Sequence, residues 1–203
     1  MLRADPIFLE TYLRDAENLS EDEFLGRFDH PFAVIPGIEI SSLNELYRSV
    51  GREQPSEVVR EPKAGKDGED NSVILCLGLR PKHGVSFDRM TVGRTADADI
   101  VILDDTVSKI HAEMSWDAYR ERCVITDLGS RNGTTVAGQV VNSGANARVS
   151  SGMIISLGNI QARFFVPRAF LSWLKNRLGS SIDTNWLVGM GSEDSTYNSS
   201  RRL

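Results

Sequence analysis

The feature that most constrains the fold is a change of hydrophobic period near residue 72. From there to residue 166 the chain is a series of short runs rich in β-branched and aromatic residues: SVILCLGL, RMTVGR, DIVIL, IHAEMSW, RCVITDL, TTVAG, MIISLG and IQARFFV. Turn-type sequences such as GSRNG and NSGANARVSSG separate them. Ala112, Met114 and Trp116 alternate with polar residues, and Ile160, Ala162, Phe164 and Val166 recur at the same spacing of two. The pattern predicts a mainly β fold, a β-sandwich of short antiparallel strands over residues 72–167.

Helical patterns flank this region on both sides. Asp5 and Pro6 are typical of an N-cap followed by a first-turn proline, and Ser20 with Glu23 has the spacing of a capping box. We therefore expect a helical N-terminal segment over residues 1–51, with SSLNELYRSVG as its last helix. Residues 52–71 combine many charges, prolines and glycines with few large apolar residues, which predicts a flexible linker. A C-terminal helix is expected over residues 168–179, and a disordered tail over 180–203.

Charge and composition exclude several classes of protein. The net charge of -5 argues against a general nucleic-acid binder or a protein held on an anionic membrane surface. The N-terminus reaches Asp5 and Glu10 before any apolar run long enough for a signal peptide, and no later run is long enough to span a membrane. We expect a cytoplasmic protein whose two cysteines, Cys76 and Cys123, are buried thiols without redox or metal spacing.

Three loops of the predicted sandwich carry polar residues suited to an anion. One holds Arg94 after Gly93, the next holds Ser108, Lys109 and His111, and the third has the sequence DLGSRNGTT. An arginine fork, a hydroxyl, an ammonium group and loop N–H groups together form a donor set for a phosphate. Each residue alone has an ordinary explanation, as a surface arginine, a turn serine or a structural histidine. Inter-strand loops at one end of a sandwich can converge, so a functional site is sought in these three loops.

The order and spacing of these elements resemble the forkhead-associated (FHA) domain, a phosphothreonine-recognition β-sandwich. The likeness rests on Gly93-Arg94, on ADIVILDDTVSKIHAEM and on ITDLGSRNGTTVAG, and covers about residues 72–167. The resemblance implies that Arg94 and Ser108 hold the phosphate, that Asn132 binds the ligand backbone, and that Lys109 and Arg131 add phosphate or flanking contacts. It also implies that three residues support the site: Gly93, His111 and Gly133. It implies no cofactor and no metal.

Other functions remain open on the sequence alone. Ser108, His111 and Asp127 are the residue types of a hydrolytic triad, but TVSKIHA lacks the G-x-S-x-G elbow, so we expect no enzyme. His30, His83 and His111 are scattered and predict no metal site. The more serious alternative is a phosphate-independent scaffold or assembly protein that uses an FHA-like domain and contacts its partners through the flanking helices.

The resemblance also implies a class of partner. A phosphothreonine reader would act as an adaptor in Ser/Thr kinase signalling, bound to a phosphothreonine-containing protein such as a kinase or its substrate. Thr184 and Thr196 lie in acidic flanking sequence. If either were phosphorylated, the flank could bind its own domain, because a tethered ligand has a high effective concentration.

Overall fold

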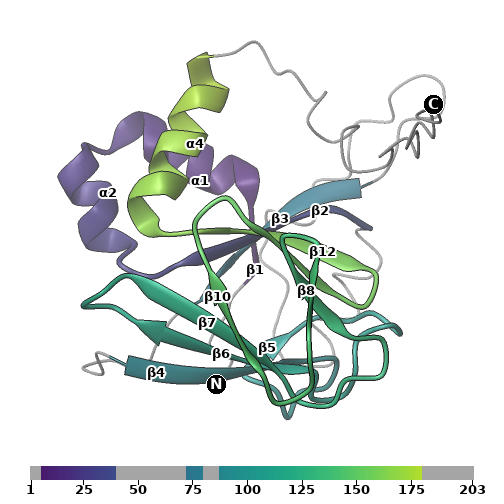
Figure 1. The fold of residues 1–203 in the computed structure, drawn as a ribbon. Helices are drawn as coiled ribbons and strands as arrows, with labels where there is room; N and C mark the ends of the chain where they lie inside the picture. Colours follow the sequence, from purple (N-terminus) through teal and green to yellow (C-terminus); the bar gives the residue numbers. More distant parts are fainter. Residues whose placement is uncertain (1–5, 40–71, 80–86, 180–203) are drawn as a thin grey trace, which may run out of the picture.

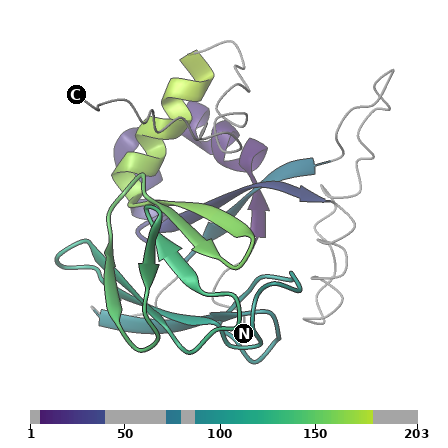
Figure 2. The same ribbon diagram turned by 45° about the vertical axis from the view of Figure 1, so that its right-hand side comes forward.

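The structure is a computed structural model that describes residues 6–39, 72–79 and 87–179. Within these residues, two β-sheets pack face to face, and helices cover the outer face of one of them (Figure 1). The turned view in Figure 2 keeps the three helices together on that side of the sandwich. The chain therefore forms the predicted β-sandwich with helical extensions.

The larger sheet holds seven of the described strands: β1 (Pro6–Phe8), β2 (Phe32–Glu39), β3 (Ser72–Gly78), β8 (Thr134–Val136), β9 (Gln139–Val141), β11 (Ile154–Leu157) and β12 (Ile160–Phe165). Their order across the sheet is β1-β3-β2-β12-β11-β8-β9. The smaller sheet holds five: β4 (Phe87–Gly93), β5 (Ile100–Val101), β6 (Ala112–Asp117), β7 (Arg122–Asp127) and β10 (Asn146–Val149), in the order β10-β7-β6-β4-β5. Paired strands run antiparallel, apart from the parallel pair β4 and β5.

The alternation predicted for the sandwich is present in the burial of its strands. In β6, Ala112, Met114 and Trp116 are buried while the residues between them are partly exposed. The same face of β7 buries Cys123 and Ile125. Burial raises the pKa of the Cys123 thiol to about 12, so this cysteine stays protonated and inert. The side chain of Cys76 lies outside the described residues.

Strand β2 joins two hydrophobic cores, and its presence corrects the sequence analysis. Ala33 and Ile35 point into the sandwich core, whereas Phe32 and Val34 point into a second core under the helices. Successive side chains of a strand face opposite sides, so one strand can serve both cores. Residues 1–51 were expected to form a helical segment, whereas residues 32–39 of it pair with β3 and β12 as a strand. The pairing with β3 shifts register between Ile35 and Ile38.

The helices are α1 (Leu9–Asn18), α2 (Glu21–Arg27) and α4 (Pro167–Gly179), which we call the helical lobe. The capping box predicted for α2 is confirmed: Glu23 N–H donates to Ser20 Oγ, and Ser20 N–H donates to the Glu23 carboxylate. The second core lies between the lobe and the larger sheet, where the ring of Phe170 stacks on Phe32 with centroids 4.0 Å apart. No helix in the described part of the chain is long and apolar enough to cross a membrane.

Some expected elements differ from the structure or fall outside it. Pro6 begins strand β1 instead of a helix, because residues 6–8 pair with β3. The expected loop at 142–152 contains β10, and β9 was not predicted. Asp5, the expected helix at 41–51, the linker at 52–71 and the tail at 180–203 lie outside the described residues.

Candidate functional site

Four connections meet at one end of the sandwich and form what we call the loop end: residues 94–99, 102–111, 128–133 and the β11–β12 turn at 158–159. The antiparallel pairing explains the meeting, since β4 and β7 end where β6 begins. The predicted Arg94, Ser108, Lys109, His111, Arg131 and Asn132 all lie in these loops. The structure therefore brings together residues separated by as many as 38 positions in the sequence.

Arg94 follows directly after β4, and its backbone is fixed to the neighbouring loop. Its N–H donates to the Ser108 carbonyl at 2.9 Å. The two loops approach so closely at Gly93 that an added Cβ would lie 2.0 Å from the Lys109 carbonyl oxygen, so only glycine fits there. The Arg94 side chain is 36% exposed, and its Nη1 donates to Asp105 Oδ1 at 2.5 Å.

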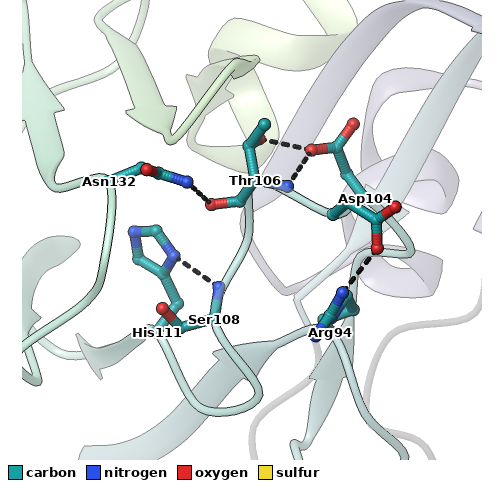
Figure 3. Close-up of polar contacts among 7 residues, drawn as sticks. Arg94, Asp104, Thr106, Ser108, His111 and Asn132 are labelled. Atoms are coloured by element: carbon teal, nitrogen blue, oxygen red, sulfur yellow. Dashed lines mark hydrogen bonds and ion pairs between the residues drawn. The ribbon is translucent and has the colours of Figure 1, made fainter.

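Ser108 and His111 bond each other, as Figure 3 shows, and each of them also bonds the third loop. Ser108 N–H donates to His111 Nδ1 at 3.1 Å, so the ring proton must be on Nε2, which lies 3.1 Å from the Gly133 carbonyl oxygen and donates to it. His111 is fully buried. Ser108 Oγ accepts the backbone N–H of Arg131 at 3.0 Å. Because that contact uses an oxygen lone pair, the Ser108 O–H is left to donate to a ligand.

Thr106 is a junction that the sequence analysis missed. Its hydroxyl donates to Asp104 Oδ1 and accepts the Asn159 N–H at 2.9 Å. Its carbonyl accepts Asn132 Nδ2 at 2.7 Å, as Figure 3 shows. Asn159 and Asn132 are 53 and 26 positions away, so local sequence spacing carries no signal for these contacts.

Asp127 organises the third loop and was also missed in this role. Its carboxylate accepts hydrogen bonds from the N–H groups of Gly129 and Ser130 and from the hydroxyls of Ser130 and Thr134. Desolvation alone would raise the pKa of Asp127, but the hydrogen bonds from Ser130, Thr134 and Gly129 outweigh it and hold the pKa below its ordinary value. The carboxylate is thus a buried, charged anchor for the loop.

These contacts do not form a hydrolytic triad. Both ring nitrogens of His111 bond backbone groups, and neither is paired with Ser108 Oγ or with Asp127. Asp127 instead bonds residues of its own loop and Thr134. Across the described ranges, no group of three His, Cys, Asp or Glu residues is arranged to hold a metal ion.

Lys109 and Arg131 add two exposed cations to the loop end. The side chains of Lys109 and Arg131 are exposed, while their backbone groups bond Thr95 and Ser108. The loops therefore present the Arg94 guanidinium, the Ser108 hydroxyl and two exposed cations at one end of the sandwich. Such a set suits a multiply charged anion with several acceptor oxygens.

Comparison with known proteins gives the family of this region. The profile of the FHA domain matches residues 90–158, which contain every predicted site residue. The oxoglutarate dehydrogenase inhibitor of Corynebacterium jeikeium (strain K411) is 33% identical over 108 residues, which are 50% of this chain and 70% of that protein.

Solved structures show a similar partial likeness. Mycobacterium tuberculosis EmbR in complex with a low-affinity phosphopeptide is 29% identical over 38% of this chain and 20% of its own, with a TM-score of 0.34. An FHA domain from Chlamydia trachomatis is 28% identical over 38% of this chain and 76% of its own, with a TM-score of 0.36.

Proposed function

Because this chain belongs to the FHA-domain family, we propose that its loop end binds a phosphorylated threonine in a partner protein, and that it acts by binding and not by catalysis. The observation that carries the proposal is that Arg94 and Ser108 lie on adjacent loops joined by a backbone hydrogen bond of 2.9 Å from Arg94 N–H to Ser108 O. Ser108 Oγ accepts the Arg131 N–H, which leaves its O–H to donate to the phosphate, and the Arg94 guanidinium bonds the exposed carboxylate of Asp105.

The chemistry of phosphothreonine fits this donor set. The group carries about -1.5 to -2 charges and three acceptor oxygens. A hydrogen bond to a charged group contributes about 1.5 to 3 kcal/mol. Two or three such bonds from Arg94, Ser108 and Lys109, less the cost of ordering the ligand, predict roughly micromolar affinity for a short peptide.

Each predicted residue has a role in this proposal. Arg94 and Ser108 hold the phosphate, and Lys109 and Arg131 approach it or its flanking residues from outside. Asn132 binds the ligand backbone with the amide atoms that its bond to Thr106 leaves free. The supporting residues are Gly93, His111 and Gly133. The Gly133 carbonyl accepts both His111 Nε2–H and the Gly158 N–H at 3.1 Å.

We propose further that the protein is an adaptor in Ser/Thr kinase signalling. The Corynebacterium relative is an oxoglutarate dehydrogenase inhibitor, so oxoglutarate dehydrogenase is a first partner to test. A pull-down with immobilised chain, before and after phosphatase treatment of the dehydrogenase, tests this partner. Phosphatase-sensitive capture supports a phosphothreonine contact with it, and no capture in either state contradicts this choice of partner.

The binding function is tested by fluorescence anisotropy of the whole chain against a library of phosphothreonine peptides, with phosphoserine and unphosphorylated controls. The proposal predicts micromolar binding that depends on the phosphate and is strongest for phosphothreonine. To exclude occupancy by its own tail, the chain is first treated with phosphatase and its mass is checked. Binding that is equal with and without phosphate would support the scaffold alternative instead.

A further inference from the structure

The Asp105 carboxylate forms an ion pair with Arg94, the arginine proposed to bind the phosphate. Arg94 Nη1 lies 2.5 Å from Asp105 Oδ1, although the Asp105 side chain is 99% exposed. An almost fully exposed carboxylate is not held there by packing, so its attraction to the guanidinium is what places it. Asp105 was not among the site residues predicted from the sequence.

Neighbouring acidic residues have other partners. The Asp104 carboxylate accepts the N–H and hydroxyl of Thr106, which makes it part of the loop framework. Asp97 accepts a hydrogen bond from the Thr95 hydroxyl at 3.4 Å. Of these three carboxylates, Asp105 is the one that meets Arg94.

The two members of the pair differ in freedom. Arg94 is half-buried, and its backbone N–H is bonded to Ser108 O, so the guanidinium is anchored at the loop end. Asp105 can release its carboxylate into water without losing buried contacts. When a ligand anion approaches Arg94, Asp105 is therefore the partner that leaves.

We propose that Asp105 is a tethered competitor of the ligand phosphate and a selectivity-determining residue of the site; this rests on the proposed phosphothreonine-binding function. Asp105 has the same single charge as an Asp or Glu side chain of a peptide, but its tether gives it a much higher effective concentration. A peptide carboxylate therefore does not displace it. A phosphothreonine displaces Asp105, because it brings more charge and further acceptor oxygens for Ser108 and Lys109.

The test is the affinity of the whole chain and three variants for one phosphothreonine peptide and for the same peptide with glutamate at that position. Exposed ion pairs contribute little, so we expect D105N to bind the phosphopeptide about two- to fivefold more tightly at low salt. That gain should shrink as added salt screens the pair. D105N should also gain affinity for the glutamate peptide, while D105E keeps the wild-type values for both peptides.

D97N is the matched control, because it removes the same charge from an adjacent loop without touching Arg94. Its affinity should stay within about twofold of wild type. If wild type binds and D105N does not bind more tightly, or if D97N gains as much, the role of Asp105 is overturned and the proposed function stands. If no variant binds any phosphopeptide, the proposed function fails and this inference with it.

Discussion

At the scale of residues, short polar side chains hold the loops of the loop end together, and long cationic side chains stay exposed. The side chains of Thr106 and His111 bond backbone atoms of neighbouring loops, and Asp127 bonds backbone N–H groups of its own loop. Lys109 and Arg131 remain exposed. Short polar side chains lose little rotamer freedom when they are ordered, whereas long cations lose more. Because short polar side chains fix the loops, the long cations can adapt to a ligand.

The Asp127 carboxylate gives the fold a predictable acid sensitivity. The pKa of Asp127 is lower in the folded chain than the ordinary value of about 3.9. The charged carboxylate therefore stabilises the fold fully at a pH above the ordinary pKa, and this stabilisation is lost as the pH falls through the folded pKa. We expect D127N to be less stable than wild type at pH 7 and to lose less stability on going to pH 3. Urea denaturation at several pH values measures both. An unchanged pH slope in D127N would contradict this account.

The residues of the site were predicted unevenly. Arg94, Ser108 and Asn132 were predicted because residue type and order along the chain signal an anion site and a family. Asp105 and Thr106 were not, because their roles depend on partners that only folding brings close. The bond from Asn159 to Thr106, for example, joins residues 53 positions apart.

At the scale of elements, helices and strands were predicted where local interactions determine them and were missed where distant pairing does. Helix α2 was predicted from its capping box, whose two residues are three apart. Strand β2 was missed because its pairing with β3 and β12 is long-range and Pro36 masks its pattern. Strands β9 and β10 are too short and polar to show an alternating pattern.

The loop junction at Thr106 allows a test of how the loops depend on one another. T106V keeps the side-chain shape but removes the hydroxyl that joins Asp104 to the β11–β12 turn. We expect the free energy of unfolding to fall by about 1 to 2 kcal/mol, because the Asn159 N–H loses its acceptor. Phosphopeptide affinity should fall with it, as the Thr106 carbonyl also positions Asn132.

T106S is the matched control, since it keeps the hydroxyl and should stay close to wild type in both urea denaturation and peptide titration. If T106V and T106S behave alike, the hydroxyl bonds do not hold the loops together.

At the scale of the whole molecule, the sandwich and the helical lobe share strand β2. Phe32 stacks on Phe170 of α4, while Ala33 beside it lies in the sandwich core. Deleting the N-terminal segment that carries α1, α2 and β2 would therefore withdraw a central strand from the larger sheet. The N-terminal segment is part of the folded unit and not an appendage to it.

This architecture predicts a single cooperative unfolding transition. Trp116 lies in the sandwich core, and Trp173 packs against the second core. In a variant that keeps Trp173 and replaces Trp116 and Trp186 by phenylalanine, the fluorescence and far-UV circular dichroism transitions in urea should coincide. The variant that keeps only Trp116 should behave in the same way. A Trp173 transition at lower urea than the dichroism of the same sample would show a separately unfolding lobe.

The most direct test of the central claim, that the Arg94 region binds the phosphate, is a titration of wild type, R94A and R120A with one phosphothreonine peptide. Arg120 is a suitable control, since it pairs with Asp117 at 3.0 Å in the β6–β7 turn, at the opposite end of these strands from Arg94. We predict that R94A binds at least about tenfold more weakly while its unfolding curve matches wild type, and that R120A binds normally. Full phosphate-dependent affinity in a folded R94A would contradict the account.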